Sequence, residues 1–424
     1  MRAVYMLAVG SFASVLVACG GSPAASFADA GPTEDAGITD DAAPADDADL
    51  ATYPAVKPDM PRVVSGGGAV LKKGSVTPVY LPGFDYVEDL TDFTKKLGAT
   101  QYWAALGEYG VGQLTQSAPI VLTNDLIVPA DIGNITDEQI QAWLIARFDG
   151  THPEFGTTPD PTSVYTLFYP EQTVITLGTG GGTSCQSFGG YHNDVTIKGQ
   201  LVPYAVIPEC NQFGALKNVD SVTAVTSHEL SEAATDPYPT DDTAYGQVDG
   251  DHLAWEFFLG GGEVGDMCAQ FSTSIYKPDD LLYVVQNNWS NVQAKAGHNP
   301  CQPVAVEGQV YFNASPTFPD KINTRGVFTK GVKVPVGESK TIPLALYSDG
   351  PMAPWTVTAT TQSRGGTTAP VTLALDKSTG GNGDILNLTI TAKTAITSTS
   401  KAVTILITSS SGGRKNTWIG LVGN

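Results

Sequence analysis

The sequence is short of basic residues and of cysteine. It contains 23 Lys and Arg against 43 Asp and Glu, a net charge of −20, and only 5 Cys. Nucleic acids and anionic membrane surfaces bind proteins through basic patches, and this chain has no basic run. Nucleic acid is therefore excluded as a partner. The absence of any Cys-x-x-Cys pair argues against a four-thiolate zinc site.

The sequence has one long apolar run, at the N-terminus, and lacks a second one. Arg2 precedes a mostly apolar stretch over residues 3–18, which is shorter than the roughly 20 residues needed to span a bilayer. This pattern is typical of a signal peptide at residues 1–18. The segment ending in Ala18 and Cys19 resembles a bacterial lipobox, which implies cleavage before Cys19 and a lipid on its side chain. We expect a lipoprotein of the bacterial cell envelope, at the outer membrane or cell surface, that contacts the membrane through this lipid.

The segment that follows, residues 19–61, is rich in Ala, Asp, Pro and Gly. It contains 9 acidic residues and a single basic residue, Lys57. Such a segment has too few large apolar side chains to bury a core, and its like charges repel one another. We predict a disordered, extended tether.

The remaining chain is long enough for two domains, which we place at residues 62–303 and 304–424. In the first, apolar spacing predicts helices at 87–97 and at 136–148, with Thr136 as the N-cap of the second helix. Runs of β-branched and aromatic residues predict strands, at 76–80, 164–169, 174–177 and 201–207.

Four cysteines remain once Cys19 is assigned to lipid: Cys185, Cys210, Cys268 and Cys301. An even number in an oxidising compartment indicates two disulfides. Of the three pairings we favour Cys185 with Cys210 and Cys268 with Cys301. Each closes a loop of about 25 to 33 residues, which would stabilise the fold by roughly 3 to 4 kcal/mol.

The most informative segment is residues 218–237, NVDSVTAVTSHELSEAATDP. Its apolar spacing predicts a helix that Asp220 or Ser221 caps and Pro237 ends. On that helix His228 and Glu232 lie four residues apart and project from one face, with Glu229 beside them. This is the spacing of the H-E-x-x-H metallopeptidases with the second His replaced by Glu. The alternative is a surface helix whose acids are merely solvated.

Further candidate ligands flank this helix. His228 and Glu232 could bind zinc while Glu229 acts as the general base. Asp236 lies one turn further on, as a ligand or as a group that orients one. The segment GEVGDMC, about 30 residues downstream, offers Glu263 or Asp266 as a third ligand. His192, in GGYHND, is a further candidate, although an isolated acid or His is more often an ordinary loop residue.

The conjunction of HELSEAATDP with GEVGDMC resembles a group of uncharacterised exported bacterial proteins with His-Glu-Leu-x-Glu-Ala helices and, more distantly, the plant phosphate-induced, EXORDIUM-like proteins. The resemblance extends to WAALGEYGVG and GGYHND and covers most of residues 75–303. It implies a zincin-like site in an extracytoplasmic protein, with His228, Glu229, Glu232, Glu263 and Asp266 carried over and His192 and the cysteines as companions. The plant proteins have Asn at the position of Asp236, so the resemblance does not make that residue a required ligand.

The last part of the chain, residues 304–424, has alternating apolar and β-branched segments separated by Gly, Pro, Ser and Asp. This pattern predicts an all-β, immunoglobulin-like sandwich. Its predicted strands are 309–312, 332–336, 341–346, 355–360, 371–375, 386–392, 402–409 and 417–422. It has no His and no Cys, so we assign no chemistry to it.

The expected fold class is thus an α+β zincin-like, metallopeptidase-type domain followed by the sandwich. The expected function is a lipid-anchored, zinc-dependent, peptidase-like hydrolase acting on a peptide or an envelope polymer. The alternatives are a non-catalytic envelope-binding protein with a structural metal, which could be calcium because the ligands are rich in oxygen, and an adhesion lipoprotein that works through its sandwich.

Overall fold

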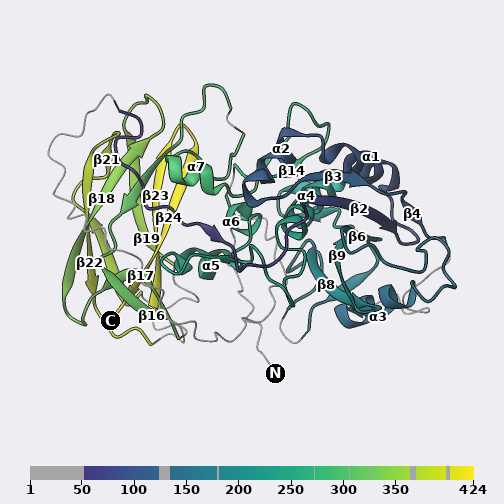
Figure 1. Ribbon diagram of the computed structural model, residues 1–424. Helices are drawn as coiled ribbons and strands as arrows, with labels where there is room; N and C mark the ends of the chain where they lie inside the picture. The colour runs from purple at the N-terminus through teal and green to yellow at the C-terminus, as the bar shows by residue number, and fades with distance from the viewer. Residues whose placement is uncertain are drawn as a thin grey trace.

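A computed structural model of the protein places a body built on a mixed sheet beside a β-sandwich (Figure 1). The structure describes residues 52–123, 134–178, 181–271, 273–304, 306–324, 326–362, 369–397 and 402–424. The predicted signal peptide, Cys19 and most of the predicted tether lie outside these ranges. Among the described residues, no helix is both long and apolar enough to cross a bilayer.

The end of the predicted tether is part of the folded protein. Met60 is 6% exposed and belongs to the main apolar core. The Ala55 amide donates a hydrogen bond of 3.0 Å to the side chain of Asn382 in the sandwich. Folded structure therefore begins before residue 62, because the apolar residues of this segment reach a core that local composition does not reveal.

The central sheet of the first body has five strands in the order β3-β2-β6-β9-β8, and short β4 (Ile120–Val121) also pairs with β2. Strands β3, β2, β6 and β9 run parallel to one another, whereas the edge strand β8 runs antiparallel to β9. Their bounds are Gln113–Gln116 for β3, Lys73–Tyr80 for β2, Ser163–Tyr169 for β6, Gln200–Pro208 for β9 and Tyr191–Ile197 for β8.

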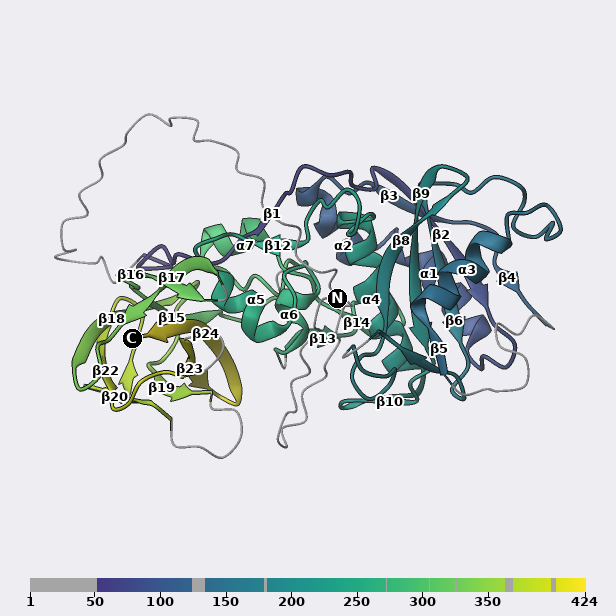
Figure 2. The same cartoon turned by 90° about the horizontal axis from the view of Figure 1, so that it is seen from below.

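Both faces of this sheet are covered, so its inner strands β2, β6 and β9 are buried along most of their length. Helices α1 (Val87–Leu97) and α4 (Asn218–Thr235) share one apolar core with one face, and α3 (Asp137–Ala146) packs in a second core against the other face. Helices α4 and α3 lie on opposite sides of strand β8 (Figure 2). The predicted bounds of α1 are confirmed, as is Thr136 as the N-cap of α3.

Helix α4 begins earlier than the sequence predicted. Its N-cap is Lys217, not Asp220 or Ser221, because the hairpin of β10 (Gln212–Phe213) and β11 (Leu216–Lys217) leads directly into the helix. Asp220 lies instead in the first turn, where its negative charge suits the helix dipole. The helix ends at Thr235, two residues before Pro237 as expected.

Shorter elements complete the first body. They are β1 (Val63–Val64), α2 (Gln101–Ala104), the 3-10 helix η1 (Ala105–Tyr109), β5 (Asn134–Thr136), β7 (Val174–Thr176), β12 (Gln247–Val248), α5 (Leu253–Leu259), α6 (Asp266–Ala269), β13 (Ile275–Tyr276), β14 (Val285–Gln286) and α7 (Asn291–Ala296). The predicted disulfides are confirmed, since Cys185 is bonded to Cys210 and Cys268 to Cys301. Two disulfides indicate a chain that folds in an oxidising, extracytoplasmic compartment.

The last part of the chain forms two sheets, of four and six strands, which is consistent with the predicted β-sandwich. The four-stranded sheet has the order β15 (Phe312–Pro316), β18 (Ser339–Ser348), β22 (Ile385–Ala392) and β20 (Val371–Leu375). The six-stranded sheet has the order β16 (Asp320–Thr324), β17 (Val327–Lys333), β24 (Arg414–Gly423), β23 (Ala402–Ser411), β19 (Trp355–Thr361) and β21 (Thr379–Gly380). Strands β16 and β21 were not predicted.

The two bodies share one apolar core through the indole of Trp255 in α5. This ring lies 5.7 Å from the ring of Trp289 in the first body and 6.0 Å from that of Trp418 in strand β24. All three side chains are fully buried. Edge-to-face aromatic contacts of this kind stabilise by about 0.5–1.5 kcal/mol beyond the apolar area that they bury.

The expected fold class, an α+β zincin-like domain, is wrong for this chain. Strands account for 36% of the described residues and helices for 19%, and the strands form several separate sheets. Many strands of the first body are only two or three residues long. A strand that short shows no alternation in the sequence, so its contribution to the fold class was missed.

The capping box of α3 gives a testable result. The Gln139 amide donates to Thr136 Oγ1, and the Gln139 side chain accepts a hydrogen bond of 2.9 Å from the Thr136 amide. Thr136→Ala removes the first of these bonds and should lower the free energy of unfolding by about 1 kcal/mol, measured by urea denaturation. The control Thr157→Ala, at an exposed site, should stay within about 0.5 kcal/mol of the parent. Equal stability of both variants would contradict the assignment.

Candidate metal centre

Helix α4 presents His228, Glu229 and Glu232 toward the interior of the first body. All three side chains are fully buried. His228 Nε2 lies 3.2 Å from Glu232 Oε2, one helical turn away. The surface-helix alternative is therefore wrong, because a solvated helix would expose these groups. The spacing of four residues does bring an imidazole and a carboxylate together, as the sequence predicted.

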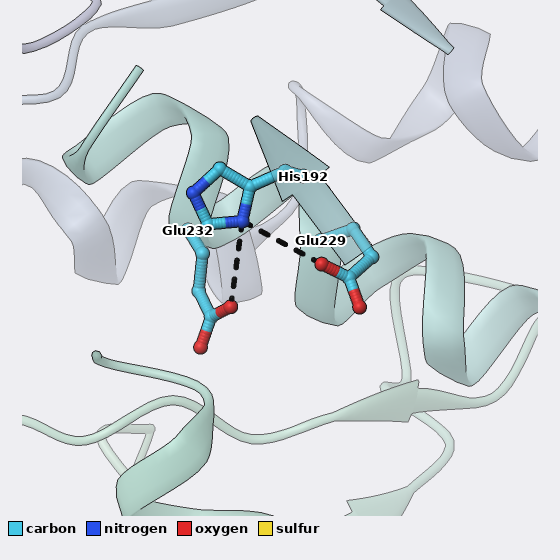
Figure 3. A group of neighbouring side chains, drawn as sticks. All are labelled: His192, Glu229 and Glu232. Atoms are coloured by element: carbon cyan, nitrogen blue, oxygen red, sulfur yellow. Dashed lines mark ion pairs between the residues drawn. The ribbon is translucent and has the colours of Figure 1, made fainter. Parts of the chain in front are cut away.

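The edge strand β8 adds His192 to this face of α4. Its Nδ1 atom lies 3.6 Å from Glu229 Oε2 and 3.7 Å from Glu232 Oε2, so one ring nitrogen faces both helix carboxylates (Figure 3). The other ring nitrogen, Nε2, lies 3.4 Å from Glu263 Oε1. His192 thus belongs to the centre, although the strand that carries it was not predicted.

The segment between α5 and α6 closes the centre from the other side. Glu232 Oε1 accepts hydrogen bonds from the amides of Gly265 and Asp266, at 3.1 and 3.0 Å. Asp266 Oδ1 lies 3.9 Å from His228 Nε2. A Cβ atom on Gly265 would lie only 2.6 Å from His228 Nδ1. The second glycine of GEVGD, Gly265, is thus explained by the close approach of this backbone to the imidazole.

Sequence reasoning missed one residue of the centre, Gln286 in β14. Its side-chain Nε2 lies 2.7 Å from His228 Nδ1 and donates to the Gly265 carbonyl at 3.0 Å. Its own amide donates a hydrogen bond of 2.9 Å to Ser227 in α4. Gln286 is more than 50 residues from His228 in the chain. No local spacing relates the two, so the sequence carried no signal for this contact.

Asp236 lies at the C-cap of α4, also fully buried. Its Oδ1 atom accepts a hydrogen bond of 2.7 Å from the Ala244 amide. This bond ties the end of the helix to the following loop. Asp236 interacts electrostatically with His192 and Glu232, but it is in neither group of converging ligand atoms found among the described residues. The structure therefore places it beside the centre and in contact with a loop.

Burial and mutual repulsion shift the pKa values of the carboxyl groups upward. Burial raises the pKa of Asp236 to about 6 and that of Glu263 to about 7, and it holds the pKa of Asp266 well above its ordinary value. Burial opposes the charged form of His228, but the neighbouring carboxylates of Glu232, Glu229 and Asp266 outweigh it and raise its pKa to about 10. The centre therefore attracts positive charge, as protons or as a cation.

Two groups of side chains could hold a metal ion. One is His192, Glu229 and Glu232, and the other is His228, Glu232 and Asp266; within each group the ligand atoms lie within 4.8 Å of one another. Imidazole nitrogen and carboxylate oxygen are both accepted by Zn²⁺. Buried carboxylates without compensating charge are costly. A divalent cation fits this donor set, and the chemistry available to it is the activation of water or the polarisation of a carbonyl group.

Comparisons with known proteins add little to this geometry. No protein family and no curated protein matches the chain. A solved structure of titin domain M4, in a trigonal crystal form, is similar to 27% of this chain and 97% of its own, with 12% identity and a TM-score of 0.16. A TM-score this low does not show a shared fold. The resemblance to exported bacterial and plant EXORDIUM-like proteins therefore stays a prediction.

The raised pKa values predict how pH affects the metal-free protein. An acid whose pKa is raised on folding stabilises the fold below its unfolded pKa and loses this effect as pH rises through its folded pKa. For Asp236 this range runs from 3.8 to about 6, and for Glu263 from 4.5 to about 7. His228 acts in the same direction between 6.5 and about 10. The Tm should therefore fall steadily across these ranges in the presence of a chelator.

Scanning calorimetry at several pH values would measure this fall. Glu263→Gln removes one titrating carboxyl group, so its Tm should fall less steeply than that of the parent between pH 4.5 and about 7. A Tm that rises with pH across this window in the metal-free parent would contradict the assignment.

Proposed function

We propose that this protein is a metal-dependent hydrolase of the cell envelope, most suited to peptide bonds or related linkages in an envelope polymer. The observation that carries the proposal is the position of Glu229. Its carboxylate lies inside the buried centre, beside the group of His228, Glu232 and Asp266. A site that only holds a metal for stability does not require a further carboxylate directly next to its histidine ligand.

Each residue has a separate role in this proposal. His228 Nε2, Glu232 Oε2 and Asp266 Oδ1 would hold the metal, and the backbone amides of Gly265 and Asp266 fix the Glu232 carboxylate through its other oxygen. A bound cation would supply Lewis-acid chemistry. Glu229 would act as the general base that accepts a proton from the attacking water. Its burial raises its pKa, which brings it closer to the pH at which a base works best.

Zinc suits this set better than calcium. Each candidate group combines one imidazole with two carboxylates. Imidazole is a common ligand of zinc, whereas calcium takes six to eight oxygen ligands and no nitrogen. Calcium remains the alternative metal, because carboxylates form the majority of the ligands.

A second candidate function is supported by the burial of the centre. His228, Glu229 and Glu232 are fully buried, and Glu263, the most exposed of the site residues, is only 7% exposed. A metal that is never reached by a substrate would instead stabilise the contact between α4, β8 and the segment from α5 to α6, in a non-catalytic envelope protein.

The variant Glu229→Gln separates the two functions. It keeps the size of the side chain but cannot accept a proton, so turnover of a peptide library should fall by about 10²- to 10⁴-fold. The cation on His228, Glu232 and Asp266 should stay bound, as measured by mass spectrometry. The control Glu209→Gln changes a buried Glu that caps the Asp85 amide at 2.9 Å outside the centre, and its turnover should match the parent. Parent-like turnover in Glu229→Gln would contradict the base role, and a parent with bound metal but no turnover would favour the structural function.

The lipid anchor is part of the proposal. It rests on the lipobox-like residues before Cys19 and on the two disulfides, which agree with export. Cys19→Ser should move the protein from the membrane fraction to the soluble fraction of a bacterial expression host, because the acceptor thiol of the lipid is lost. Immunoblotting of the two fractions measures this change. A variant that stays with the membrane would contradict anchoring at Cys19.

A further inference from the structure

The two groups of converging ligand atoms have one member in common. Glu232 belongs to the group of His228 and Asp266 and also to the group of His192 and Glu229. The same oxygen, Glu232 Oε2, lies 3.2 Å from His228 Nε2 and 3.7 Å from His192 Nδ1. A carboxylate placed between two imidazoles in this way has the arrangement of a ligand shared by two cations.

The buried imidazole of His192 is an independent sign of a missing ligand. His192 is 3% exposed, and its ring nitrogens meet carboxylate oxygens of Glu229, Glu232 and Glu263 only at 3.4 to 3.7 Å, longer than an ordinary N–H···O hydrogen bond. The ring is nevertheless directed between Glu229 and Glu232 (Figure 3). Buried polar atoms are nearly always paired. A cation bound at Nδ1 would give this nitrogen its partner.

Each imidazole also has a polar side chain on its far nitrogen. Glu263 lies behind His192, with Oε1 3.4 Å from Nε2, and Gln286 lies behind His228, 2.7 Å from Nδ1. Histidines that bind metals usually donate their second N–H to such a group, which fixes the ring. A cation on His228 Nε2 requires the proton on Nδ1, so the Gln286 amide would then turn its oxygen toward the ring and give up its hydrogen bond to the Gly265 carbonyl. Each histidine thus has a polar side chain within reach of its second ring nitrogen.

The charge of the centre supports two cations better than one. Five buried carboxyl groups, those of Glu229, Glu232, Asp236, Glu263 and Asp266, surround two imidazoles. The main charges acting on these acids are one another and the two histidines. Each divalent cation that binds here would offset two ionised carboxylates, so five acids around two neutral imidazoles can accommodate two cations. Buried uncompensated charge is strongly unfavourable.

We propose that the centre binds two divalent cations that share the carboxylate of Glu232. His228 and Asp266 complete the ligands of the first cation, and His192 and Glu229 complete those of the second. This proposal rests on the metal binding of the proposed function and adds a second site to it. Ligation of Glu229 through Oε2, the atom that faces His192, would make it a ligand in the centre that holds two cations. The general-base role of Glu229 belongs to the centre that holds only the first cation.

Metal stoichiometry tests the proposal directly. The full chain, extracted in detergent and purified without a histidine tag, is stripped with chelator, loaded with Zn²⁺, desalted and analysed by mass spectrometry. We expect two zinc ions per chain. One zinc ion per chain would overturn the shared centre and leave the proposed function standing. No bound zinc would overturn both. This measurement needs no variant, so a folding defect cannot obscure it.

Variants then assign each ion to its ligands. His192→Ala and Glu229→Gln should each retain one zinc ion, because the first group stays intact, and His228→Ala should also retain one. Glu232→Gln should lose both, because it removes the shared ligand. The matched control is His252→Ala, which removes a buried His that pairs with Asp249 at 2.8 Å outside the centre and should retain two. Two ions in His192→Ala, with circular dichroism like that of the parent, would overturn the assignment of the second site.

Discussion

Burying several carboxylates on one side of helix α4 is the constraint to which the surrounding structure is fitted. No interaction between the acids themselves can offset the loss of their hydration, so the centre must take up positive charge. The two histidines come from different elements, α4 and β8, and both turn a nitrogen toward Glu232. The edge strand, the helix and the glycine-rich segment converge on this group of acids and histidines.

The segment from α5 to α6 owes its position to several independent contacts. The Cys268–Cys301 disulfide holds its end, the Trp289 amide donates a hydrogen bond of 2.7 Å to the Val264 carbonyl, and Gln286 donates to the Gly265 carbonyl. Two of its amides then bind Glu232. A carboxylate held by backbone amides keeps its orientation without a cation. This segment therefore prepares one ligand in advance, which reduces the ordering that metal binding requires.

What the sequence could predict was set by the range of each interaction along the chain. His228, Glu229 and Glu232 are related by helical spacing, the disulfides close short loops, and the sandwich strands alternate over enough residues to be seen. The contacts of His192 and Gln286 with α4 join segments that are distant in the sequence, so no residue spacing predicts them. The prediction of a zincin-like fold class is wrong because a local motif was extended to a whole domain. The predicted N-cap of α4 is wrong because a hairpin, and not a capping side chain, starts the helix.

The shared aromatic core of Trp255, Trp289 and Trp418 limits how this protein can be cut. A protease that cleaved the connection near residue 304 would leave two fragments, each with indole rings that the other had covered. Large apolar surfaces exposed in this way promote aggregation. We therefore expect neither part to stay soluble as an isolated fragment. In evolutionary terms, another module could replace the sandwich only if it supplied a new apolar surface to cover Trp255 in place of Trp418.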